Sequence, residues 1–214
     1  KSSLSNNEKA CSNSHIRALK YFLNTDKNTC IVLEDDIIFS NNFFSFFRDF
    51  EDMPSGVKVI KLETVRRNIT LKKPFLKFMS SKLYEFSSFH SGSGAYMVSR
   101  SGAKLILDEL EKYSLPSDHV IFENFLSTQF SKYIFQIYPA ICIQECILYK
   151  TDDSDIAKDR KLKFHKDFLE KTKERSTFLF KIKREIFRLL RQLRLLFYVY
   201  SNCSRYKYGK VKFK

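Results

Sequence analysis

The feature that most constrains the fold is a short apolar run, Cys30-Ile31-Val32-Leu33, which follows a helical segment that begins with a cap. Ser5 and Glu8 fit a capping box, and this predicts a helix that runs from there to about Asn24. Four uncharged apolar residues in a row are typical of a strand that is buried on both faces of a sheet. The chain thus passes from helix to buried strand within its first 33 residues, and this order favours an α/β layered fold.

The alternation of strands and helices continues to about residue 143. Further strands are predicted at residues 57–62, 83–89, 95–99, 134–138 and 141–143. Further helices are predicted at residues 43–50, 101–113 and 120–126. Residues 66–82 are basic and irregular, and we expect a loop there that partly covers a site.

Three consecutive carboxylates, Glu34, Asp35 and Asp36, follow the first predicted strand directly. Ligands of open α/β sheets bind beyond the carboxyl ends of the strands, and a divalent cation such as Mg²⁺ or Mn²⁺ would relieve the repulsion there. In an extended segment, Glu34 and Asp36 point to one side and Asp35 to the other, so the first and third form the better pair of ligands. The alternative is that the acids only cap the next helix or form a solvated loop.

Composition and charge narrow the class of protein. The chain is 43% hydrophobic and 29% charged, as in globular proteins, and has no uncharged apolar stretch long enough to span a membrane. It begins with Lys1 and nothing resembles a signal peptide, so we expect either a processed chain or a missing start. The five cysteines form no Cys-x-x-Cys pair, which favours buried thiols in a reducing compartment over a disulfide framework or a zinc site.

The net charge of +14 lies in the C-terminal quarter, because residues 158–214 hold 19 of the 38 basic residues but only 5 of the 24 acidic ones. Within this part, residues 178–200 place apolar side chains on one helical face and mostly cations on the other. This pattern predicts a helix that lies on an anionic membrane surface. A helix that packs its apolar face on the domain is the alternative. The broad apolar face argues against a nucleic-acid-binding module, although that class stays open.

Several sequence blocks occur in an order that resembles glycosyltransferase family 25, the lipooligosaccharide galactosyltransferase group. The blocks are EKACSNSHIRALKYFL, CIVLEDDIIFS, VIKLE, SGSGAYMVSRSGAKLIL, PSDHVIFENF and YPAICIQE, within residues 4–145. The resemblance implies a Rossmann-like fold of the GT-A type, UDP-galactose as donor, Mn²⁺ or Mg²⁺, and inversion at the anomeric carbon. Relatives begin with an additional strand and helix, so we expect that this chain is either a fragment or a short member whose activity is in doubt.

The resemblance also assigns roles to single residues. It implies that Asp36 binds the metal directly, with Glu34 near the metal or the ribose, and it extends the donor site to Asp35, His15, Gly92 and Gly94. His119 is a candidate metal or phosphate ligand, with a structural imidazole as the alternative. An inverting transfer needs a carboxylate base for the acceptor hydroxyl, and Asp118 is the first candidate and Glu63 the second. Each role has an alternative. His15 could be structural, and the two glycines could simply form a tight turn. Asp118 and Glu63 could cap a helix or lie on the surface.

These interpretations combine into one hypothesis. Residues 1–157 form a catalytic domain, and residues 158–214 attach it to the cytoplasmic face of a bacterial inner membrane, where it glycosylates a lipid-linked oligosaccharide. An inactive truncated relative is one alternative and a nucleic-acid-binding module is another. Acceptor sugar, linkage and oligomeric state stay open.

Overall fold

The computed structural model describes residues 4–48, 50, 52–73, 75–112, 115–122, 133–151 and 204–214, with isolated residues between 185 and 201. Within them lies a mixed six-stranded sheet in the order β1-β7-β3-β8-β6-β5. All neighbouring strands are antiparallel except β3 and β8, which run parallel. The strands of this sheet are β1 (Thr29–Leu33), β3 (Val59–Lys61), β5 (Leu76–Phe78), β6 (Ser81–Glu85), β7 (Ala95–Ser99) and β8 (Ile134–Tyr138). The predicted α/β fold is therefore confirmed in its mixed, Rossmann-like form.

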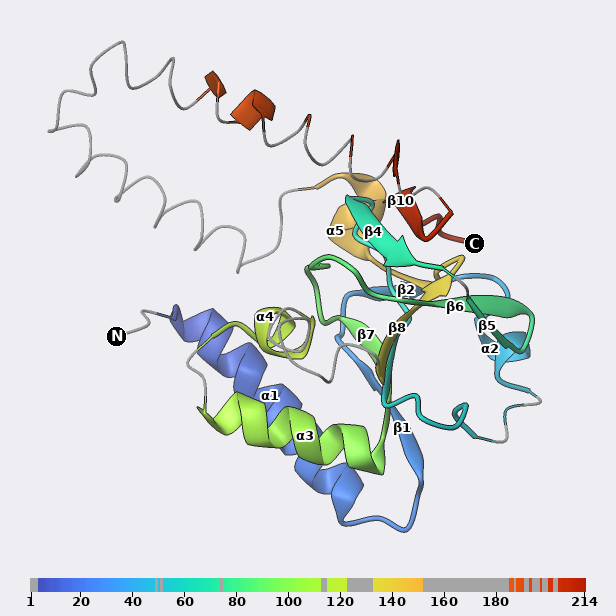
Figure 1. Cartoon of the computed structure of the whole chain (residues 1–214). Coiled ribbons are helices and arrows are strands. Elements are labelled where there is room, and N and C mark those ends of the chain that lie inside the picture. The colour runs from blue at the N-terminus through green and yellow to red at the C-terminus, as the bar shows by residue number, and fades with distance from the viewer. Residues whose placement is uncertain are drawn as a thin grey trace, which may run out of the picture.

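Three helices cover one face of the sheet (Figure 1): α1 (Asn6–Leu23), α3 (Arg100–Lys112) and α4 (Ser117–Phe122). Leu19 of α1 and Ile106 of α3 pack in one buried cluster with Val59 and Val98 of the sheet. The predicted capping box is present, because the Ser5 hydroxyl accepts from the Glu8 N–H and Glu8 accepts from the Ser5 N–H. The sequence signals for α1 and α3 are thus confirmed.

The opposite face of the sheet is covered by α2 (Phe43–Phe46) together with a small two-stranded sheet, β2 (Ile37–Phe39) and β9 (Cys142–Gln144). Phe43 and Phe46 pack with Ile60 and Met97, the strand neighbours of the residues that face α1 and α3. Side chains of β3 and β7 therefore alternate between the two cores, as a sheet buried on both faces requires.

The segment predicted as an irregular loop, residues 66–82, instead contains two complete strands, β4 (Asn68–Lys72) and β5. Strand β4 pairs with β10 (Tyr206–Lys210) near the C-terminus. Val211 is buried, and the backbone of Lys212 and Lys214 bonds with Ala140. The last eleven residues thus belong to the body. Helix α5 (Glu145–Tyr149) lies near β4 at the top of the view in Figure 1. Most of residues 158–203 lie outside the described part, so the proposed division at residue 157 stays a prediction.

Strand β1 lies where the sequence predicts a strand, but it is less buried than expected. β1 is the last strand at one edge of the described sheet, and of its residues only Val32 is buried while Leu33 is 40% exposed. The prediction of burial on both faces was wrong for this strand. An apolar run alone does not reveal whether both neighbours of a strand are present.

Candidate active site

The three acidic residues form the turn between β1 and β2, at the carboxyl end of β1. Asp35 is exposed, whereas Glu34 and Asp36 both face the side-chain amide of Gln144 on β9. The amide nitrogen lies 3.1 Å from Glu34 Oε2 and 3.4 Å from Asp36 Oδ2. The predicted pairing of Glu34 with Asp36 on one side, away from Asp35, is confirmed, although a turn rather than an extended segment produces it.

The charge distribution around Asp36 favours a cation. Burial raises the pKa of the Asp36 carboxyl above its ordinary value, and the negative charges of Glu34, Glu63 and Asp35 raise it further. Only the hydrogen bond from Gln144 opposes them. Carboxylate oxygens that lie close together are the donor set that Mn²⁺ and Mg²⁺ prefer. The residues present therefore fit a hard divalent cation at Asp36 and Glu34.

Beside the acids lies a cleft of about 320 Å³. Its lining comes from six separate segments of the chain. The lining residues are Glu8, Cys11, Glu34, Val65, Arg67, Ser91, Gly92, Ser93, Pro116, Ser117, Asp118, Gln144, Cys146 and Ile147. The cleft thus brings together most blocks that carried the family resemblance, with Arg67 as the basic residue among its lining.

His15 lies under Glu34 and is 3% exposed. Its Nε2 is 3.3 Å from Glu34 Oε1, and its Nδ1 is 3.1 Å from the Tyr96 hydroxyl. Burial lowers the pKa of the imidazole, but the interactions with Cys11 and Glu34 outweigh it and raise the pKa to about 9. A protonated His15 would supply positive charge next to Glu34. The structure brings His15 to the predicted site as a buried partner of Glu34 that does not itself line the cleft.

The glycine corner of residues 91–94 is held by a buried ion pair that the sequence argument missed. Lys61 and Glu63 are both fully buried and lie 2.9 Å apart (Nζ to Oε1). Lys61 also donates to the carbonyl oxygens of Ser91 and Gly92, and Glu63 Oε1 accepts from the Gly94 N–H at 2.8 Å. The Lys-x-Glu spacing at the end of a strand was the available signal, because i and i+2 share a face.

Both glycines are required by backbone geometry and close packing. Gly92 has a φ of +87°, which favours glycine. A Cβ on Gly94 would lie 2.9 Å from Ile37 Cδ1 and 3.2 Å from Glu63 Oε2. These contacts favour the tight-turn alternative, while Gly92 still lines the cleft.

The two candidate bases lie in different surroundings. Asp118 lines the cleft, and its Oδ2 accepts from the Gly92 N–H at 2.9 Å. Glu63 is fully buried beneath the glycine corner and does not line the cleft. The His119 ring packs on Phe89, with centroids 4.8 Å apart, and is not part of the lining. The structure thus brings Asp118 to the acids' cleft but does not place Glu63 or His119 on its surface.

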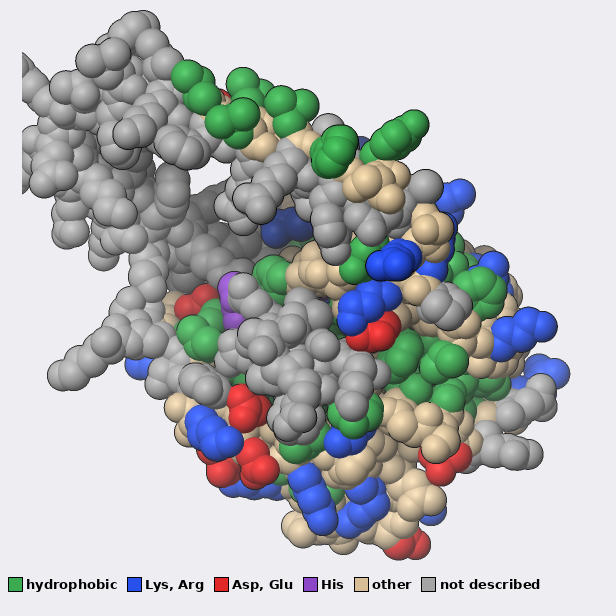
Figure 2. Space-filling view, viewed as in Figure 1, with side chains coloured by type: hydrophobic (Ala, Val, Ile, Leu, Met, Phe, Trp, Pro, Cys, Tyr) green, Lys and Arg blue, Asp and Glu red, His purple; other side chains and the backbone are tan. Residues whose placement is uncertain are grey.

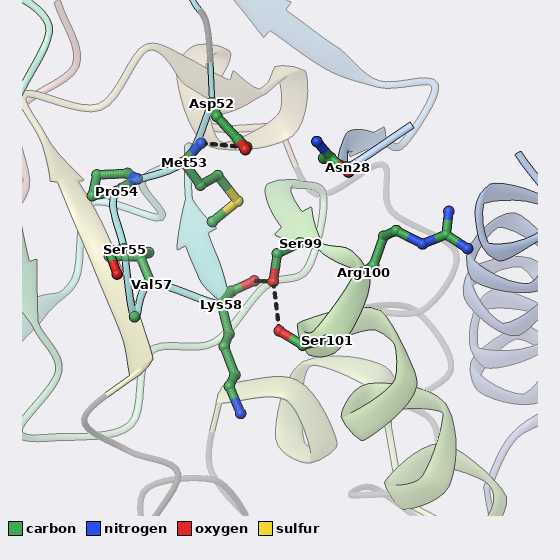
Figure 3. A pocket seen from close by; sticks show the side chains of 11 residues that line it. Asn28, Asp52, Met53, Pro54, Ser55, Val57, Lys58, Ser99, Arg100 and Ser101 are labelled. Carbon is green, nitrogen blue, oxygen red and sulfur yellow. Dashed lines mark hydrogen bonds between the residues drawn. The ribbon is translucent and has the colours of Figure 1, made fainter. Parts of the chain in front are cut away.

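A second pocket lies at the opposite end of the strands, between the start of β3 and the end of β7 (Figure 3). Arg100 borders it, but its guanidinium points toward α1 and donates to the carbonyl oxygens of Leu23, Thr25 and Lys27. Arg100 therefore caps the C-terminus of α1, as a cation near a helix end should. It is about one strand length from the acids and takes no part in their site.

Known proteins resemble the half of the chain that builds this cleft. A sequence model of glycosyltransferase family 25, described as an LPS biosynthesis protein, matches residues 1–121. The chain belongs to glycosyltransferase family 25. The matched residues contribute most of the cleft, including Glu34, the glycine corner and Asp118.

Two relatives from Haemophilus influenzae support the same family assignment. The lipooligosaccharide biosynthesis protein lex-1 is 28% identical over 155 residues, which cover 66% of this chain and 50% of lex-1. The lipooligosaccharide biosynthesis protein lic2B is 26% identical over 156 residues, which cover 70% of this chain and 58% of lic2B. The match therefore spans 50–58% of the length of these two relatives.

Proposed function

We propose that this chain is a metal-dependent, inverting galactosyltransferase that transfers galactose from UDP-galactose to a lipooligosaccharide acceptor. The observation that carries the proposal is that Glu34 and Asp118 line one cleft, formed mostly by residues that match the family, and that Asp36 shares the Gln144 amide with Glu34. A GT-A-type fold is part of the proposal, and the mixed sheet with helices on one face is compatible with it.

Asp36 and Glu34 are the residues that would hold Mn²⁺ or Mg²⁺. When bound, the cation supplies positive charge that stabilises the diphosphate leaving group as the sugar is transferred. Gln144 holds the carboxylates of Glu34 and Asp36 close to each other, because its side-chain amide donates to both. His15 fixes the other oxygen of Glu34, so that the carboxylate keeps one orientation. Asp35 is exposed, and we assign to it only a peripheral contact with the donor.

Asp118 is our proposed general base. It lies in the cleft wall, and both of its oxygens accept backbone N–H bonds, from Gly92 and His119, which fix the carboxylate while leaving a lone pair on each oxygen. A base must reach the acceptor hydroxyl, and Glu63 is too deeply buried to do so. We therefore propose that Glu63 positions the glycine corner. For His119 to bind a metal or phosphate as proposed, its ring would have to move away from Phe89, on which it packs.

The proposed acceptor is a lipid-linked oligosaccharide at the cytoplasmic face of the inner membrane. The names of lex-1 and lic2B support this acceptor class. Within residues 178–200, the described apolar residues are exposed rather than packed on the body (Figure 2): Ile186, Leu189, Leu190, Leu193, Phe197 and Tyr200. This exposure supports membrane attachment over the alternative of packing on the domain. Among helices made of described residues, none is long and apolar enough to cross a bilayer.

The test is hydrolysis and transfer of a panel of UDP-sugars in the presence of Mn²⁺, with wild-type chain, Asp36→Ala and Asp35→Ala. We expect Asp36→Ala to lower turnover by about two orders of magnitude, because it removes the charge that would hold the cation at the leaving group. Asp35→Ala is the matched control, since it removes a neighbouring but exposed acid. Its turnover should stay within about threefold of wild type.

Calorimetry with UDP and Mn²⁺ separates binding from chemistry. We expect saturable UDP binding by wild type, and Asp118→Asn should retain it while losing turnover. Equal turnover of wild type and Asp36→Ala would refute the metal assignment. A wild-type chain that binds no UDP would refute the transferase proposal and leave the inactive-relative hypothesis.

A further inference from the structure

A cluster of three different ligand types lies at the inner end of the cleft. Cys11 and His15 are one helical turn apart on α1, so their side chains share a face, and Glu34 meets them from the end of β1. One ligand atom from each, Sγ, a ring nitrogen and a carboxylate oxygen, lies within 4.8 Å of the other two. The family assignment gives Glu34 a role at the donor, but it leaves the thiol and its approach to the imidazole unexplained.

Two of the three distances within this cluster are close to those of a tetrahedral metal site. With Zn–S of about 2.3 Å and Zn–N and Zn–O of about 2.0 Å, tetrahedral ligands lie about 3.3 Å apart for N and O and about 3.5 Å apart for S and O. The observed separations are 3.3 Å from His15 Nε2 to Glu34 Oε1 and 3.7 Å from Cys11 Sγ to Glu34 Oε1. These two separations, with the third below 4.8 Å, are compatible with a small ion bound by all three atoms.

We propose that Cys11, His15 and Glu34 form a zinc-binding site with its fourth position open to the cleft. A thiolate and an imidazole with one carboxylate are a borderline-soft donor set, which Zn²⁺ prefers and which Mn²⁺ and Mg²⁺ do not. This site is thus chemically distinct from the all-oxygen pair at Asp36.

The surroundings of the cluster are those of a built site. His15 is 3% exposed, and its Nδ1 lies 3.1 Å from the hydroxyl of Tyr96, which is fully buried. If Nδ1–H donates to this hydroxyl, a metal that displaces the proton from Nε2 would meet the Nε2 lone pair on the side of Cys11 and Glu34. Such outer partners orient a metal-binding histidine.

An entry path and a fourth ligand are both available. Cys11 and Glu34 line the cleft, so an ion reaches them from solvent. The hydroxyl of Ser117 is 3.5 Å from Cys11 Sγ, and that of Ser93 is 3.4 Å from His15 Nε2. The fourth position, beside these hydroxyls, suits a water molecule or a substrate oxygen.

The two proposed sites share Glu34 through different oxygens. Oε1 faces Cys11 and His15, whereas Oε2 faces Gln144 and thereby Asp36. Zinc at the cluster would therefore fix the orientation of Glu34 at the donor site and change the affinity for UDP. Only this last consequence rests on the proposed function, because zinc binding itself needs no donor.

Cobalt provides a direct test, because Co²⁺ bound by a thiolate in a tetrahedral site gives a sulfur-to-metal absorption band. The full chain, kept reduced with a phosphine, is titrated with Co²⁺ alone and then with Zn²⁺. We expect the band to appear at one equivalent and to disappear as Zn²⁺ displaces Co²⁺. Cys11→Ser should abolish it, and Tyr96→Phe should keep it but weaken the affinity for Co²⁺ about tenfold or more.

Cys146→Ser is the matched control, because Cys146 lines the same cleft but is not part of the cluster. It should keep the band at full intensity. A wild-type chain without the band, or a band that survives Cys11→Ser, would overturn the proposal. Circular dichroism checks that Cys11→Ser is folded, and His15→Gln, which should weaken Co²⁺ binding about 100-fold, repeats the test at a second ligand.

Asp36→Ala distinguishes this proposal from the proposed function. It should lose sugar transfer but bind Co²⁺ as wild type does, because Asp36 contributes no atom to the cluster. Loss of the cobalt band in Asp36→Ala would show that the two sites are one, and would overturn the separate zinc site.

Discussion

Replacement of Lys61 by Met should destabilise the chain strongly, even though Met fills a similar volume. The Lys61 side chain is fully buried, and its Nζ lies 2.9 Å from Glu63 Oε1, 3.1 Å from the Ser91 carbonyl oxygen and 4.3 Å from the centre of the Phe122 ring. It also donates to the Gly92 carbonyl oxygen. Removing the ammonium leaves the Glu63 carboxylate as an uncompensated charge in the interior.

The expected cost follows from these contacts. Breaking a buried ion pair by removing one partner costs about 3–5 kcal/mol of unfolding free energy, because the remaining charge is desolvated. Glu63 Oε2 already has no hydrogen-bond partner among the described residues, so no other donor is in place to take over. A domain of this kind has about 5–15 kcal/mol in total, so Lys61→Met should remove about a fifth or more of it.

The double variant Lys61→Met/Glu63→Gln tests the reason for this loss. Gln at position 63 keeps an oxygen for the Gly94 N–H but carries no charge, so the double variant should recover about 2 kcal/mol relative to Lys61→Met. Urea unfolding followed by circular dichroism measures all three chains. A double variant that is no more stable than Lys61→Met alone would refute the argument from uncompensated charge.

Two further predictions concern pH and membranes. Burial and the charge of Lys61 hold the pKa of His90 well below 6.5, so the unfolded chain binds this proton more readily than the folded chain. The free energy of unfolding should therefore fall as the pH drops below about 6.5, by up to about 1.4 kcal/mol per pH unit, and His90→Asn should show a shallower slope in urea unfolding at each pH. Leu193→Glu/Phe197→Glu should reduce sedimentation with phosphatidylglycerol vesicles, since both side chains are more than 60% exposed. Tyr21→Glu, at an equally exposed aromatic residue on α1, is the control, and equal binding of all chains would exclude a role for the C-terminal segment.

Local signals predicted the elements whose cause is local. The capping box of Ser5 and Glu8 predicted the start of α1, and helical periodicity predicted α3 within one residue at each end. The pairing of Glu34 with Asp36 was also predicted, although through the wrong local geometry. In each case the residues that determine the structure are within a few positions of one another.

Elements that depend on distant partners were missed. The residues of β4 are irregular in pattern because its partner, β10, lies more than 130 residues away and covers it only in the folded chain. The helix predicted at residues 43–50 ends at Phe46, and β2, with only three residues, is stabilised by pairing with β9. Hydrophobic periodicity carries no information about such pairings.

The same distinction explains why the acidic turn could be located but not fully interpreted. Each of its three carboxylates is stabilised by a different partner, which is either solvent or a residue far away in the sequence. Asp35 is exposed, Glu34 is next to the buried imidazole of His15, and Asp36 shares a single neutral amide from Gln144. Burial and three neighbouring acids raise the pKa of Asp36, and among the described residues no cationic side chain opposes them. Asp36 is therefore the position where an external cation would relieve the most repulsion, which is why its replacement is the sharpest test of the proposed metal.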